Sequence, residues 1–240
     1  MKRVSDAVAR LREIESSAGR SDGVVCFARL YREVTEGVAA QLDAHTFQNG
    51  SFVEALDLGF AGLFFDAHAS FAEDPRTTPR AWLPLFERRA RRDIAPLQFA
   101  LAGMNAHINR DLPVALVDTC RSLGLDLRTG SPEHADYLRV NALLAKVESR
   151  VKQSYLSSWT KLADRLLHRA GHVDDVVAMW DVARARDAAW TNGLALWRLR
   201  DDPGLSAQFL LTLDRMVGLA GRGLLQPQSS VLGRLRRLFG

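Results

Sequence analysis

Apolar residues recur every three to four positions along almost the whole chain, which is the spacing of one face of an α-helix. No stretch alternates apolar and polar residues over the length of a strand, and valine and isoleucine rarely cluster. The repeats predict helices over residues 4–14, 22–42, 51–71, 96–123, 131–167, 176–199 and 205–219. The pattern therefore predicts an all-α, single-domain bundle of about seven to nine helices.

Short motifs mark the expected helix boundaries. Ser51, with Glu54 three residues later, has the pattern of a capping box, and Ser131 before a proline has the pattern of an N-cap. Thr78, which precedes Pro79, is expected to cap a short helix that Pro84 interrupts locally. The Asp-Pro-Gly run at residues 202–204 is expected to end the helix before it.

The predicted helix over residues 96–123 contains the most unusual stretch of the chain, GMNAHINRDLP at residues 103–113. Pro113 has no N–H to donate to the carbonyl of Asn109, so we expect a kinked central helix. Apolar residues on nearly all sides predict that this helix is buried, namely Leu97, Leu101, Met104, Ile108 and Leu112 on one stripe and Phe99, Ala102 and Ala106 opposite.

Four polar side chains stand beside the apolar stripe of this helix. His107 and Asp111 flank it on one edge, and Asn105 and Asn109 flank it on the other. An unpaired buried polar group costs about 1–3 kcal/mol, so these residues predict either an internal hydrogen-bond network or a functional site. We expect the two asparagines to position a substrate.

His107 and Asp111 are one helical turn apart, so the carboxylate can orient the imidazole and raise its basicity. This is the arrangement of a general base and its orienting group. The same spacing supplies two ligands to a divalent metal, with His134, Asp66 or Asp57 as possible completions from other helices. A third interpretation is a buried structural latch that fixes helix register.

Two further residues are candidates for a second proton-transfer group. His134 stands at the third position of its helix, where free N–H groups lower the proton affinity of an imidazole. Asp66 follows an apolar run, so it is either the end of an apolar face or a buried acid with a raised pKa. Tyr137 and Asn141 share one helix face and are candidate substrate-binding residues, and an asparagine in mid-helix is expected to have a partner.

Composition and charge narrow the classes of partner. With 240 residues, of which 47% are hydrophobic, the chain is long enough for one domain with a substantial core. The formal net charge is +4, but the excess of arginine lies mainly in residues 88–92 and 222–237, so we expect no nucleic-acid partner. We expect a bundle domain over residues 1–225 and a separate basic amphipathic segment over residues 226–240 that packs on the body, a partner or an anionic surface.

Cys26 and Cys120 are the two cysteines, and both stand in apolar helical settings. They suit small buried hydrophobic residues better than a disulfide framework or a zinc site. No apolar run approaches the ~20 residues of a membrane span, and no apolar signal region follows the first residues. We therefore expect a cytoplasmic protein without a transmembrane segment, and the sequence leaves a homodimer open.

Several blocks of the chain resemble an uncharacterised, mainly actinobacterial, all-helical family classified as a domain of unknown function. The resembling blocks are residues 22–38, 52–67, 103–113, 131–148 and 185–190. The most specific are the central stretch at residues 103–113 and HADY at residues 134–137. The resemblance implies a helical fold for the residues before Asp201, leaves the tail after it outside the family, and implies no particular activity.

The sequence favours an enzyme that acts on a small, largely apolar molecule held between helices. His107 would be its acid-base group, and Gly103 and Ala100 would leave room for the molecule beside it. No organic cofactor motif is present, which suits a cyclase, isomerase or hydrolase, including steps of specialised metabolism. The alternative is a non-catalytic binding or scaffold protein whose polar cluster is a latch. A cavity beside His107 would favour the enzyme, and a fully packed network would favour the latch.

Overall fold

The structure is a computed structural model that describes residues 1, 3–144 and 181–227. Within these residues every regular element is helical, so the all-α prediction is confirmed. The helices are α1 (Val4–Ser17), α2 (Gly23–Asp43), α3 (Gly50–Glu73), α4 (Leu83–Arg88), α5 (Pro96–Ala106), α6 (Leu112–Leu123), α9 (Val182–Arg198) and α10 (Pro203–Leu224). A 3-10 turn η1 (Pro75–Thr77), a π-helical turn η2 (His107–Asp111) and a helical stretch over residues 132–144 complete them.

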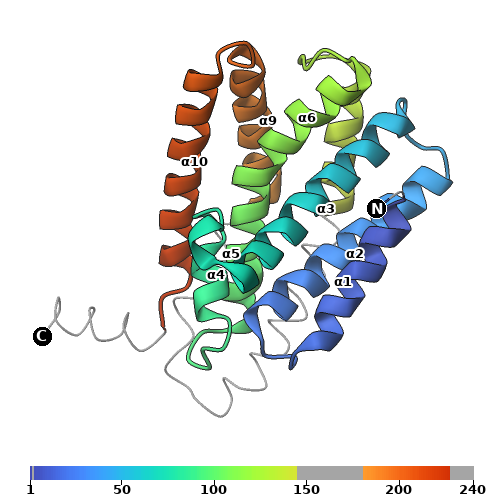
Figure 1. Ribbon diagram of the computed structural model, residues 1–240. Helices are drawn as coiled ribbons and strands as arrows, with labels where there is room; N and C mark the ends of the chain where they lie inside the picture. Colours follow the sequence, from blue (N-terminus) through green and yellow to red (C-terminus); the bar gives the residue numbers. More distant parts are fainter. Residues whose placement is uncertain (2, 145–180, 228–240) are drawn as a thin grey trace, which may run out of the picture.

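One long helix, built from α5, η2 and α6 without a break, runs through the middle of the molecule (Figure 1). Helices α1 and α2, drawn in blue, lie on one side of it, and α9 and α10, drawn in orange and red, lie on the other. Its first half packs against α2 and α10, and its second half packs against α3 and α9. A helix that is apolar on nearly all sides is thereby surrounded by partners, as its sequence requires.

The core is divided into two main clusters along this helix. The first joins α1 to α5 and is rich in aromatic rings, with Phe27, Phe64, Trp82 and Phe86 each fully buried. The second joins parts of α2, α3 and the π turn to α6, α9 and the stretch over residues 132–144. Both cysteines lie buried and free within these clusters, as their apolar setting predicts.

Several helix boundaries agree with the sequence prediction. Asp22 caps α2 by accepting hydrogen bonds from the backbone N–H groups of Val24 and Val25. Ser131 is the predicted N-cap, because its hydroxyl accepts from the backbone N–H of His134 at 3.1 Å. The expected continuation of this helix to residue 167, the start of the next at residue 176 and the basic segment after residue 227 lie outside the described residues.

Three boundary motifs act differently from the prediction. The cap of α3 is Asn49, whose side chain accepts from the N–H of Phe52 at 3.1 Å, because the helix already begins before Ser51. Thr78 ends the turn η1, and α4 starts later with Pro84 in its first turn, where a missing N–H costs nothing. Asp202 begins α10, accepting from the N–H of Leu205 at 3.0 Å.

The central helix continues past Pro113 by way of a π-helical turn just before it. The backbone N–H of Leu112 donates to the carbonyl of His107, five residues earlier. This wider turn gives the helix a way to accommodate a proline that donates no hydrogen bond. The irregularity expected from the proline is therefore present, and it holds His107 and Asp111 at the two ends of the π turn.

No helix among the described residues combines the length and the apolar character needed to cross a membrane.

Candidate functional site

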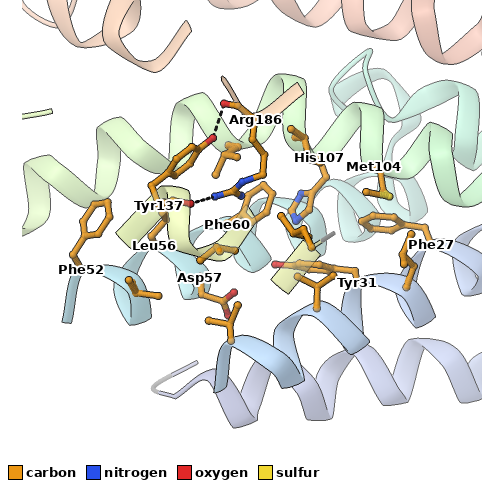
Figure 2. Close-up of a pocket in the computed structure, with 18 residues that line it drawn as sticks. Phe27, Tyr31, Phe52, Leu56, Asp57, Phe60, Met104, His107, Tyr137 and Arg186 are labelled. Atoms are coloured by element: carbon orange, nitrogen blue, oxygen red, sulfur yellow. Dashed lines mark hydrogen bonds between the residues drawn. The ribbon is translucent and has the colours of Figure 1, made fainter. Parts of the chain in front are cut away.

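An apolar cavity lies between α2, α3, the central helix, α9 and residues 137–144 (Figure 2). It has about 760 Å³ of space free of protein atoms, a volume that includes adjoining solvent. Its wall is formed by Phe27, Leu30, Tyr31, Val34, Val38, Phe52, Val53, Leu56, Asp57, Phe60, Met104, His107, Ile108, Leu112, Tyr137, Val140, Leu144 and Arg186. The few polar groups among so many apolar ones are typical of a small-molecule site.

The predicted pair of His107 and Asp111 forms at one wall of this cavity. The Nδ1 atom of His107 lies 3.1 Å from Oδ2 of Asp111, and both side chains are buried. The indole N–H of Trp82 donates to the same oxygen at 3.0 Å, and the Arg110 guanidinium donates to Oδ1 at 2.8 Å. Because Oδ2 accepts from Trp82, we assign the His107 proton to Nδ1 as a second donor, which leaves Nε2 as a proton acceptor.

The carboxylate of Asp111 is also tied to α10 through charged neighbours. Arg110, which donates to it, places its Nε 3.7 Å from Oδ1 of Asp214. Asp214 in turn accepts from the backbone N–H groups of Arg80 and Ala81 at 2.9 and 3.1 Å. The π turn, α10 and the segment before α4 are thus joined by one polar network, so Asp111 has a structural role whatever His107 does.

The imidazole of His107 is enclosed by aromatic rings. It stacks on Phe60 with a centroid distance of 3.5 Å and an angle of 8° between the planes, and the Tyr31 ring meets it edge-on at 4.5 Å. Burial lowers the pKa of His107 below its usual value, and the contact with Asp111 opposes that shift only in part. The ring is therefore neutral at pH 7, which is the form that a general base needs.

Three buried polar atoms around the cavity have no hydrogen-bond partner among the described residues. They are Nε2 of His107, the hydroxyl of Tyr31 and Oδ2 of Asp57. They come from the central helix, α2 and α3, and all three residues line the same cavity. Proteins rarely leave such atoms unpaired, since each costs about 1–3 kcal/mol when buried alone.

Asp57 is the acid that faces the cavity. Burial raises its pKa to about 7, so at that pH the carboxyl group is divided between its neutral and charged forms. Burial, together with the charge of Asp57, raises the pKa of Tyr31 well above its usual value and keeps that hydroxyl protonated. The cavity thus holds a neutral base, a permanent donor and an acid that titrates near neutral pH.

The pH dependence of stability tests this state of Asp57. Its folded pKa of about 7 exceeds the unfolded value near 4, so between these pH values the folded chain holds a proton that the unfolded chain has lost. The contribution of this bound proton to the free energy of unfolding is complete below about pH 4 and is lost as the pH rises to 7. Asp57→Asn abolishes this loss, so we expect its stability relative to wild type to increase by roughly 2–3 kcal/mol from pH 5 to pH 8.

Denaturant unfolding of both proteins at the two pH values measures this change. Because His107 is present in both proteins, its own titration cancels in the difference between them. An Asp57→Asn variant whose stability relative to wild type is the same at pH 5 and pH 8 would contradict the prediction.

At another wall of the cavity lies a buried arginine. Arg186 of α9 donates through Nε to the side-chain oxygen of Asn141 at 2.6 Å and through Nη2 to the backbone oxygen of Tyr137 at 2.9 Å. Its guanidinium lies 4.0 Å above the Tyr137 ring, whose hydroxyl donates to the backbone oxygen of Arg186 at 2.7 Å (Figure 2). Tyr137 thus lines the cavity as one of the candidate residues, and Asn141 has the partner that its position predicts.

The other candidate residues lie away from the cavity wall. Asn105 donates to the backbone oxygen of Val217 at 2.9 Å and accepts from Asn109 at 3.1 Å, so this pair fastens the central helix to α10. His134 packs on Trp190, 4.5 Å between ring centroids, and its Nδ1 accepts from a backbone N–H. Asp66 is exposed on α3.

The described structure also bears on two other expectations, the possible metal site and the space beside Gly103. The described residues hold no group of three or more histidine, cysteine, aspartate or glutamate side chains placed to bind a metal ion. The space expected beside Gly103 is occupied by Phe27, because a Cβ atom at this glycine would lie 2.4 Å from that ring. Phe27 is itself part of the cavity wall, so the free space lies beyond its ring and not beside Gly103.

Sequence reasoning missed Tyr31, Phe60 and Arg186 as parts of the site, and considered Asp57 only as a metal ligand. For Asp57 and Arg186 the sequence did contain a signal. Asp57 falls at helical spacing from buried Val53 and Phe64, and Arg186 falls four residues after buried Val182. A charged residue on the apolar face of its own helix is the pattern that would have identified both.

Comparison with known proteins adds the family. Residues 4–227 match a family described as "Family of unknown function (DUF5995)". The chain belongs to this family. The chain matches no curated protein and no solved structure. The family match continues past Asp201 through α10, so the expectation that the tail after Asp201 lies outside the family is wrong. DUF5995 thus includes the helix to which Asn105 and Arg110 are fastened.

Proposed function

We propose that this protein is an enzyme that transfers a proton on a small, largely apolar molecule bound in the cavity. The observation that carries the proposal is the set of unpaired polar atoms, His107 Nε2, Tyr31 hydroxyl and Asp57 Oδ2, which converge on one apolar cavity from three helices. A bound molecule with a hydroxyl or carbonyl group would supply the missing partners. The reaction classes that need such groups and no organic cofactor are isomerisation, cyclisation and hydrolysis.

Each polar group has a distinct part in this proposal. Nε2 of His107 takes a proton from the bound molecule, while Asp111 holds the ring by Nδ1 and stabilises the imidazolium that forms. Asp57, with a pKa of about 7, supplies the second proton from its neutral form, so the molecule gains one proton for the one that it loses. Tyr31 donates a hydrogen bond from a hydroxyl that stays protonated. The apolar wall lowers the local polarity, which strengthens these interactions.

The alternative function, a non-catalytic protein with a structural latch, is favoured by one specific observation. Every oxygen of Asp111 already has a protein donor, from Trp82, His107 or Arg110. A latch needs only the Nδ1 side of His107, whereas catalysis needs Nε2. The two functions therefore depend on different atoms of the same ring.

Two substitutions separate these atoms. In His107→Asn, the amide nitrogen can replace Nδ1 and keep the hydrogen bond to Asp111, but nothing replaces Nε2. We expect this variant to fold with a loss of about 1–2 kcal/mol from the smaller side chain and to lose activity at least about a hundredfold. In His107→Gln, the amide reaches the Nε2 position and gives up the Nδ1 contact, so we expect the larger loss of stability.

Untargeted mass spectrometry of an apolar small-molecule extract, incubated with each protein, measures the activity. The proposal requires a compound that wild type consumes with formation of a product and that the folded His107→Asn variant leaves unchanged. Conversion by both proteins would remove His107 from the mechanism. Saturable binding of a compound that wild type leaves chemically unchanged would favour the binding protein.

A further inference from the structure

Arg186 is the buried charge that the proposed acid-base chemistry does not use. Its side chain lines the cavity, the residue is only 5% exposed, and it is the one arginine among the buried residues of the described ranges. The other arginines with buried or half-buried ion-pair partners, such as Arg110 and Arg32, face a carboxylate directly. Arg186 forms no ion pair within the described residues, and its two side-chain hydrogen bonds go to uncharged oxygens.

This situation is costly for a cation. Burial lowers the pKa of Arg186, and the interactions with Tyr137 and with the exposed neighbour Asp187 oppose that shift only in part. Stacking on the Tyr137 ring at 4.0 Å recovers part of the cost. Buried charges in proteins are normally paired, so a guanidinium in this position favours an anion brought by the bound molecule.

The donors of Arg186 that remain free fit such an anion. Nε and Nη2 are engaged by Asn141 and Tyr137, which fixes the plane of the guanidinium, and Nη1 has no hydrogen bond among the described residues. In Figure 2, Arg186 enters the cavity from one side, and Asp57 and Tyr31 come from the opposite side. An anion at Arg186 would therefore bind apart from the acid, with apolar side chains between them.

We propose that the cavity binds an apolar monocarboxylate, with its carboxylate on Nη1 of Arg186 and its hydrocarbon body along the apolar wall. This inference rests on the proposed function for the presence of a small molecule and adds the chemical class of its recognition group. Nη1 carries two N–H groups that can donate to a carboxylate, and a charge-assisted hydrogen bond of this kind is about twice as strong as one between neutral groups. The reacting part of the molecule then lies towards His107, Tyr31 and Asp57.

Decanoate and decanamide test the inference, because they have the same hydrocarbon chain and differ in the charge of the head group. Calorimetric titration at pH 6 is appropriate, since decanoate is ionised and Asp57 is mostly neutral there. For wild type we expect decanoate to bind at least about tenfold more tightly than decanamide. We expect Arg186→Gln to reduce this preference to less than about twofold and Arg186→Lys to retain part of it.

A matched control is available on the same helix. Arg184 has an 88% exposed side chain paired with Asp181, so Arg184→Gln makes the same change in net charge outside the cavity. We expect this variant to keep the full preference for decanoate. Equal affinity of wild type for both probes, a preference for decanamide, binding of neither, or an equal loss in the Arg184→Gln variant would each overturn the inference.

This experiment fails separately from the test of the proposed function. Decanoate is a binding probe and need not react, so its affinity does not depend on proton transfer by His107. If a compound is converted in a His107-dependent way but decanoate is not preferred, the proposed enzymatic function stands and the carboxylate site is rejected. If decanoate is preferred but no compound is converted, the protein is a carboxylate-binding protein and not an enzyme.

Discussion

Replacing Asp111 by asparagine is expected to lower the free energy of unfolding by about 3–5 kcal/mol. Oδ2 accepts from both Trp82 and His107, and Oδ1 accepts from Arg110. An amide turns one of these acceptors into a donor and removes the negative charge beside the Arg110 guanidinium. Either orientation of the asparagine therefore leaves at least one buried donor facing another donor, in a site where Asp111 has no exposed surface.

Urea unfolding of the two proteins measures this loss. Asp93→Asn is the matched control, because Asp93 also pairs with an arginine, Arg91, but has 44% of its side chain exposed. Exposed ion pairs contribute at most about 1 kcal/mol, so the control should lie close to wild type. If both variants lose the same small amount, Asp111 does not hold the π turn, and its role in positioning His107 would also be removed.

Replacing Gly218 by alanine is expected to destabilise the fold by about 3 kcal/mol. A Cβ atom at this position in α10 would lie 2.5 Å from the backbone oxygen of Arg80 and 2.9 Å from its carbonyl carbon. A side chain could rotate away from such a clash, but the backbone of Arg80 and Ala81 is held by Asp214 of the same helix. The methyl group would have to separate α10 from the segment before α4.

The control for Gly218 is Gly62→Ala in α3, where a Cβ atom would meet nothing within 4 Å. Alanine is the better helix former, so this variant should be more stable than wild type by about 0.5–1 kcal/mol. Thermal unfolding of the two variants should therefore shift in opposite directions. A Gly218→Ala variant that is as stable as the Gly62→Ala variant would show that α10 does not pack closely on the Arg80 backbone.

The network around Asp111 makes stability and the proposed chemistry depend on the same residue. Asp111 fixes His107 by Nδ1 and is itself fixed by Trp82 and Arg110. A rigid support of this kind keeps the free nitrogen of His107 in one direction. The unpaired groups on the cavity side are the part of the arrangement that a stable fold alone does not require.

Features set by neighbouring residues could be predicted from the sequence. The helical repeat of apolar residues determined the all-α fold and the burial of the central helix, since each helix must cover its own apolar face. The spacing of His107 and Asp111 determined their contact, because residues four apart on a helix are neighbours. Caps that depend on a few adjacent residues, such as Ser131, were also predictable.

The choice between Asp57 and Asp66 shows where the repeat could have been used further. The two residues are nine positions apart, and at about 100° per residue this separation amounts to about two full turns and a further 180°. The two carboxyl groups therefore face opposite sides of α3. Asp57 shares the buried face with Phe64, and Asp66 is exposed. The apolar run before Asp66 indicated burial of its neighbours, but the helical angle decides burial for the residue itself.

Only the tertiary structure decided which helix faces which. Asn105 has the polarity of a substrate-positioning residue, but α10 supplies its partner, the backbone oxygen of Val217, 112 positions along the chain. Gly103 has no side chain, but Phe27 fills the space. Arg186 meets Tyr137 and Asn141 because α9 returns to the far end of the cavity. A repeat along one helix gives the direction of each side chain, whereas its partner comes from the packing of distant segments.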